Sequence, residues 1–159
     1  MPTLLVKNEQ EILDVLTYII QCTLLTPEDD SLEDLKKEII ILKEMGCMGK
    51  LEANHFLAVG ARTLKLIDRL RDEDSQILFD PHAFAHFLWN KHQKYGAEPL
   101  LEVGALGIIM RLISKINRVI NMQTLATIYT TDDEDTLMDI LGYCVLGYQL
   151  MRTTDGKIN

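Results

Sequence analysis

The chain has 159 residues, 47% of them hydrophobic, and carries a net charge of −8 at pH 7 with an isoelectric point near 4.9. This length is sufficient to bury the core of one domain, and a protein this acidic is not expected to bind nucleic acid directly, because the nucleic-acid backbone favours a basic surface. No apolar run approaches the roughly 20 residues that a membrane span requires, so no membrane association is predicted.

Apolar residues recur at helical spacing along nearly the whole chain, and no segment alternates convincingly as a strand does. We therefore predict an all-α fold, a helical bundle of about six helices in a single domain covering 1–159. The N-terminal part, 1–79, carries no recognised motif. Its expected helices run over Asn8–Leu25, Leu32–Met45 and Leu51–Arg71. Ser31 is the expected cap of the second helix, and Arg69 and Arg71 are expected on a solvated helix end.

The C-terminal part, 80–152, holds three more expected helices and precedes a tail, 153–159, that we expect to be frayed. Asp80 and Pro81 are typical of a helix start, with Asp as the cap and Pro in the first helical position. The first of these helices is expected to end near Tyr95–Gly96. The second is expected to run over Leu100–Met122, and the third to lie within Asp132–Met151.

The last of these helices starts acidic and becomes almost wholly apolar, which predicts a buried helix. Asp135 and Asp139 are four residues apart and share one face of it. Because unpaired buried charge is costly, this pair is a candidate metal site. Alternatively, Asp132, Asp133 and Glu134 cap the helix and complement its dipole. Capping does not account for Asp139, more than a turn further along.

The preceding helix carries a basic stripe of Arg111, Lys115 and Arg118, at positions i, i+4 and i+7. Gly104 and Gly107 lie on roughly the same face, where small residues allow a ligand or another backbone to approach closely. Arg and Lys beside a metal ion are a recurrent arrangement for binding phosphates. The cations and carboxylates of the two helices can equally pair with each other, and the spacing alone leaves both interpretations open.

Cysteine and histidine positions give little sign of a metal centre. The three cysteines, Cys22, Cys47 and Cys144, form no CxxC motif and leave at least one thiol unpaired. With no recognisable signal peptide, this pattern predicts a reduced, cytoplasmic compartment. His82 and His86 are spaced as zinc ligands can be, but no third ligand supports them, and we expect histidines at or near the surface.

Three motifs occur in a fixed order over about residues 84–152: KxxxYG, then GxxGxxxRxxxKxxRxxN, then EDTxxDIxxY. In this order they resemble the nucleotide-modification-associated domain of type 1, a family found largely in phage and bacterial genomes. By similarity that family belongs to the all-α nucleoside triphosphate pyrophosphohydrolases, the MazG and dimeric dUTPase group. The matching residues are Lys91, Tyr95, Gly96, Gly104, Gly107, Arg111, Lys115, Arg118, Asn121, Glu134, Asp135, Thr136, Asp139 and Tyr143.

The resemblance implies a MazG-like core that hydrolyses a (deoxy)nucleoside triphosphate to the monophosphate and pyrophosphate with Mg²⁺, or with Mn²⁺ in its place. Catalytic and metal-binding roles then fall to Glu134, Asp135 and Asp139, with Glu98 and Glu102 as further metal ligands. Substrate binding falls to Lys91, Tyr95, Arg111, Lys115, Arg118 and Tyr143. The resemblance also implies a homodimer or higher homo-oligomer in a bacterial or phage-infected cytoplasm.

The chain departs from the family pattern at two positions. Ala97 and Ser114 stand where the family commonly has Asp. Since hard cations require several oxygen ligands, their loss favours a second hypothesis, a catalytically degenerate bundle that binds a nucleotide or a partner protein. In a third hypothesis the protein is an interaction module in which Asp135 and Asp139 only pair with Arg111 and Arg118.

Overall fold

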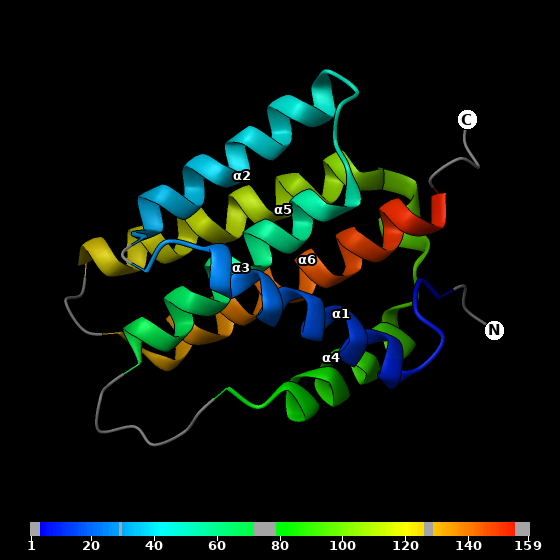
Figure 1. Cartoon of the computed structure of the whole chain (residues 1–159), viewed down its shortest axis with the longest axis horizontal. Coiled ribbons are helices and arrows are strands. Elements are labelled where there is room, and N and C mark those ends of the chain that lie inside the picture. The colour runs from blue at the N-terminus through cyan, green and yellow to red at the C-terminus, as the bar shows by residue number, and fades with distance from the viewer. Residues whose placement is uncertain (1–3, 29, 72–78, 126–128, 155–159) are drawn as a thin grey trace.

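The computed structural model describes residues 4–28, 30–71, 79–125 and 129–154. Within these ranges the chain forms six α-helices, one short 3₁₀ turn and no β-strand, which confirms the predicted all-α bundle (Figure 1). The elements are α1 (Glu9–Cys22), η1 (Thr23–Leu25), α2 (Leu32–Cys47), α3 (Ala53–Leu70), α4 (Pro81–Tyr95), α5 (Glu98–Leu125) and α6 (Thr131–Thr154).

The helix starts follow local capping chemistry. The Asn8 side chain accepts a hydrogen bond from the backbone N–H of Glu11, and Asp80 caps α4 ahead of Pro81. Ser31 forms the predicted cap of α2, within a reciprocal capping box. At the other end of the first helix the prediction was too long, because α1 ends at Cys22 and the next three residues tighten into η1.

The fifth helix differs from the continuous helix that periodicity predicts. Gly104 has φ of 69° and ψ of −168°, which breaks α5 into a short first segment and a long second one. A Cβ at Gly107 would collide with the side chain of Val103, so both glycines are required at this kink. The two glycines therefore shape α5 itself. Glu98 and Glu102 belong to the short segment before the kink, and the basic stripe belongs to the longer segment after it.

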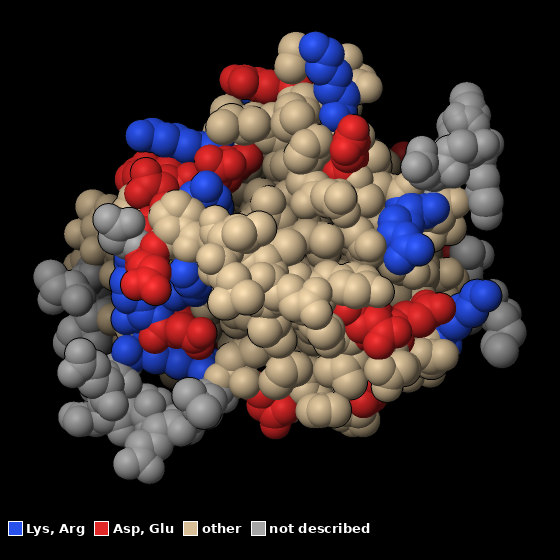
Figure 2. Space-filling model, viewed as in Figure 1, with Lys and Arg blue, Asp and Glu red and all other residues tan. Residues whose placement is uncertain are grey.

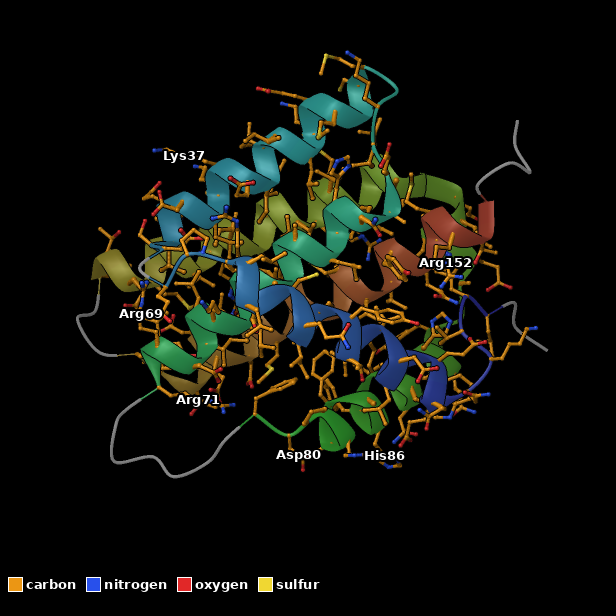
Figure 3. The ribbon with its side chains drawn as sticks, viewed as in Figure 1. Lys37, Arg69, Arg71, Asp80, His86 and Arg152 are labelled. Carbon is orange, nitrogen blue, oxygen red and sulfur yellow. The ribbon has the colours of Figure 1, made fainter. Side chains whose placement is uncertain are left out.

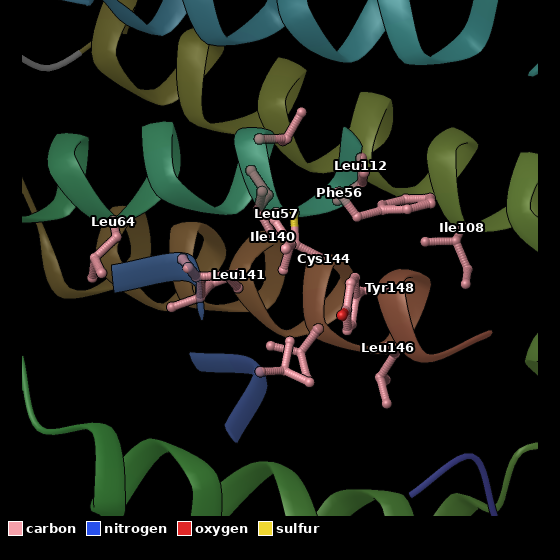
Figure 4. Packing of buried hydrophobic residues seen from close by; sticks show 14 of the residues in the cluster. Phe56, Leu57, Leu64, Ile108, Leu112, Ile140, Leu141, Cys144, Leu146 and Tyr148 are labelled. Atoms are coloured by element: carbon pink, nitrogen blue, oxygen red, sulfur yellow. The ribbon is translucent and has the colours of Figure 1, made fainter. Parts of the chain in front are cut away.

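Helix α6 lies inside the bundle, as its apolar circumference predicts. It packs chiefly against α3 and α5, while α2 covers α5 and α1 crosses α3 and α6 (Figures 1 and 4). The buried apolar residues of α6 are Leu137, Ile140, Leu141, Cys144, Val145, Leu146, Tyr148 and Leu150. Burial raises the pKa of the Cys144 thiol, which makes it an inert core residue.

Charged residues gather where α2 begins and α3 ends, beside a largely uncharged middle of the same face (Figure 2). From α3, Arg62 pairs with Asp30, and the Lys65 Nζ atom donates to the carbonyl oxygen of Thr26 at 2.7 Å. These contacts fasten the connection between α1 and α2 onto α3. No helix of the described ranges has the length and apolarity needed to cross a membrane.

Candidate functional site

A cavity of about 500 Å³ lies between α4, α5 and α6. Helix α4 packs mainly onto α1, and the space on its other side, toward the α5–α6 pair, is left open. This volume is within the usual range of small-molecule pockets. Its apolar lining consists of Phe84, Phe87, Leu88, Pro99, Leu100, Met138 and Leu146. Its polar lining side chains are Lys91, His92, Tyr95, Arg111, Lys115, Asp139 and Tyr143.

Three cations and one carboxylate meet in this pocket. The Asp139 Oδ2 atom accepts from the Lys115 Nζ atom at 3.0 Å, and its Oδ1 atom lies 3.8 Å from the Lys91 Nζ atom. Arg111 is the third cation. The pocket lining therefore carries a net charge of +2 in a chain whose overall charge is −8. A concave site of this sign concentrates anions.

Aromatic rings accompany the cations. An Arg111 nitrogen donates to the Tyr143 hydroxyl at 3.3 Å, and its guanidinium carbon lies 5.8 Å from the centre of the same ring. The Lys91 Nζ atom lies 5.1 Å from the centre of the Phe87 ring. Phe87 and Tyr95 are themselves exposed at the pocket. Cation–π contacts of this kind orient the charged groups without neutralising them.

The pocket brings together six of the eleven residues predicted to have a catalytic, metal-binding or substrate-binding role: Lys91, Tyr95, Arg111, Lys115, Asp139 and Tyr143. Five others do not line it. Arg118, Asp135, Glu98 and Glu102 are exposed, and Glu134 pairs with Arg71 at the end of α3. Among the described residues, Asp139 is thus the one carboxylate of the pocket. In the described ranges no group of three or more His, Cys, Asp or Glu side chains is placed to hold a metal ion.

The acidic start of α6 serves capping and tertiary pairing. Asp133 is buried, and its Oδ2 atom accepts from the Thr130 backbone N–H at 2.9 Å and from the Gln123 side chain at 2.7 Å. This supports the capping interpretation for Asp133. Glu134, in the first turn of α6, accepts from the Arg71 Nε atom at 2.5 Å. Arg71 lies where α3 ends (Figure 3). The expectation that Arg71 is solvated was therefore wrong, because its side chain is 13% exposed and pairs with a residue 63 positions away.

His92 is a site residue that sequence reasoning missed. It is 4% exposed, lines the pocket, and its Nε2 atom accepts from the backbone N–H of Leu5 at 2.9 Å. The bond fastens the N-terminal segment to α4. The helical periodicity of the sequence could have identified it, since His92 falls on the same buried face of α4 as Ala85 and Leu88. His82 and His86 are exposed as expected, and His86 pairs with Glu9.

We expect His92 to make stability depend on pH. Burial lowers its pKa below 6.5, against a smaller opposing effect of the Glu98 carboxylate. As the pH falls, the imidazole of the unfolded chain therefore takes up its proton before that of the folded chain does. The contribution of neutral His92 to the free energy of unfolding is complete above about pH 6.5 and is lost as the pH falls through the pKa of the folded state. Protonation also removes the acceptor that Leu5 uses. The melting temperature of the wild type should fall more steeply below about pH 6.5 than that of His92→Gln, and parallel curves would contradict this role.

Comparisons with protein-family models, with curated proteins and with solved structures give no match for this chain. The chemistry of the pocket therefore stands on the residues that line it.

Proposed function

We propose that the pocket between α4, α5 and α6 binds a nucleotide. The single observation that carries this proposal is the convergence of Lys91, Arg111 and Lys115, from two helices, with aromatic rings around one cavity of about 500 Å³. The cations suit a phosphate group, since charge-assisted hydrogen bonds to phosphate are among the strongest in proteins. The exposed rings of Phe87 and Tyr95 suit a base, because aromatic stacking accepts any base.

The lining supports a ligand with two unlike ends. A free inorganic anion would use the cations and leave the apolar wall of Phe84, Leu88 and Leu146 without a partner. A wholly apolar ligand would cover the partly exposed Lys91 and Lys115, and removing these charges from water is costly even beside Asp139. A nucleotide satisfies both parts of the pocket at once.

Magnesium-dependent release of pyrophosphate from a nucleoside triphosphate is a second candidate. It rests on the resemblance, and the observation that favours it is the presence of Asp139 among the cations. The described residues do not form a multi-carboxylate metal site, so the ion would have to arrive with the triphosphate. A pyrophosphate-release assay on the wild type tests this candidate directly. The homodimer or higher oligomer expected from the resemblance stays a prediction.

Thermal unfolding with a panel of nucleotides tests the binding proposal. A ligand that binds only the native state raises stability by about 2.7 kcal/mol at 100 times its dissociation constant, which for a chain of this size raises the melting temperature by several degrees. We expect such a rise with at least one nucleotide, and a smaller one with its nucleoside or with inorganic phosphate at the same concentration. No rise with any nucleotide, with or without Mg²⁺, would contradict the proposal.

A further inference from the structure

The charges of the pocket indicate how many phosphate groups it accommodates. Lys91 and Lys115 both face Asp139, and Arg111 completes a set with a net charge of +2. His92 adds no charge near neutral pH because burial lowers its pKa. A phosphate monoester carries a charge of about −1.5 to −2 at pH 7. One such group therefore neutralises the pocket lining.

A chain of phosphates fits the remaining lining poorly. Apart from Lys91, Arg111 and Lys115, no cationic side chain of the described residues lines the cavity, and most of its wall is apolar or aromatic. Charges added beyond the first phosphate would face that wall or the Asp139 carboxylate. Unpaired charge in such surroundings is costly, and the acidic chain as a whole repels it further.

We propose that the ligand is a nucleoside monophosphate, bound as its dianion without a metal ion, and that Asp139 acts as the counter-ion which the phosphate displaces from Lys91 and Lys115. This rests on the proposed nucleotide binding and narrows it to one ligand class. The carboxylate lies 3.0 Å from one ammonium nitrogen and 3.8 Å from the other, where a phosphate oxygen would otherwise bind. No bond forms or breaks in this exchange of partners.

The role given to Asp139 is opposite in sign to that of a metal ligand. As a counter-ion it competes with the phosphate, so its removal strengthens binding. As a metal ligand it would be required for binding of a triphosphate with Mg²⁺, and its removal would weaken that binding. Asp139→Asn keeps the shape of the side chain and removes its charge, which makes the sign of the change a direct readout.

Isothermal titration calorimetry of wild type and Asp139→Asn with nucleoside mono- and triphosphates, each in EDTA and in Mg²⁺, tests the proposal. We expect the wild type to bind the monophosphate in EDTA at least as tightly as the triphosphate, with less than about a twofold change on adding Mg²⁺. Asp139→Asn should bind the monophosphate about fivefold more tightly, as expected when two partly exposed ion pairs no longer compete. Asp135→Asn, an exposed change on the same helix, is the matched control and should leave affinity unchanged.

Three results would overturn the proposal in distinguishable ways. Binding that requires Mg²⁺, or that Asp139→Asn weakens, would assign Asp139 to a metal and the pocket to a triphosphate, and nucleotide binding itself would stand. If Asp135→Asn strengthened nucleotide binding as much as Asp139→Asn does, the gain in affinity would come from the net charge of the protein and not from the displacement of Asp139. No binding of any nucleotide to wild type or Asp139→Asn in any condition would contradict the proposed function as well. Melting curves of both variants without ligand establish that they are folded.

Discussion

Replacing Lys115 with alanine is expected to weaken nucleotide binding by about tenfold to a hundredfold. Lys115 extends from α5 into the pocket, and its Nζ atom is the cation nearest to Asp139. A hydrogen bond to a charged group contributes about 1.5–3 kcal/mol, which corresponds to that range of affinities. The change is measured as the dissociation constant of the nucleotide by calorimetry, at one fixed salt concentration because surface electrostatics are screened.

The basic stripe on α5 offers a matched control. Arg118 is three residues further along the same helix, carries the same charge and is exposed, but it does not line the pocket. Arg118→Ala should therefore change affinity by less than about twofold, since only long-range electrostatics are lost. Equal losses in the two variants would show that net charge alone attracts the ligand. Unchanged binding in Lys115→Ala would favour the hypothesis that these charges only pair with one another.

Lys115→Ala also has a stability readout that separates binding from folding. In the Lys115–Asp139 pair, each of the two side chains is about 30% exposed. Partly exposed ion pairs contribute at most about 1 kcal/mol, so the variant should melt within a few degrees of the wild type. A much larger loss of melting temperature would mean that the pair holds α5 and α6 together and has a structural role.

Replacing Gly147 with alanine is expected to lower the free energy of unfolding by about 1–3 kcal/mol. Gly147 lies in α6 where α3 packs against it, and a Cβ there would come within 2.6 Å of the Phe56 ring. Phe56 is fully buried with Ile108 and Leu112 in the core cluster (Figure 4), so its ring has little room to move. The helical preference of alanine over glycine offsets at most about 1 kcal/mol. Chemical denaturation measures the difference.

Gly142 supplies the control for this prediction, five residues earlier in the same helix. A Cβ there would meet the Leu88 Cδ1 atom at 3.4 Å, an ordinary contact. Gly142→Ala should therefore leave stability unchanged or raise it by up to about 1 kcal/mol. Gly147→Ala should also cost less in a Phe56→Leu background, because the colliding ring is gone. Similar losses in Gly142→Ala and Gly147→Ala would contradict the packing argument.

Local chemistry explains why the helices were predictable. Ser31, Asp80 and Pro81 act within one turn of the chain, and the apolar stripes need only helical periodicity, so each signal is complete within its own segment. Burial of α6 followed in the same way from its apolar circumference. The kink in α5 was missed because periodicity continues across Gly104, and only its positive φ interrupts the helix.

The candidate site divides along the same line. Spacing along single helices singled out Arg111 and Lys115 on one helix and Asp139 on the next, and the ordered motifs added Lys91 and Tyr143. The sequence did not show which of these side chains contact one another. The Lys91–Asp139 contact, for example, joins residues 48 positions apart and depends on how α4 is placed against α6. Arg71 and His92 have partners 63 and 87 residues away, and nothing in their own segments names those partners.

By itself, the sequence determined the helices, their caps, the buried last helix and the set of charged residues available for a site. The tertiary structure decided how those charges are used. It placed Asp139 between Lys91 and Lys115, directed Glu134 to Arg71, and left Asp135 in solvent. The physical reason is the range of the interactions. Helix formation and capping act over a few residues of the chain. The net charge of a pocket depends on which faces of different helices lie opposite one another, and the packing of the core decides that.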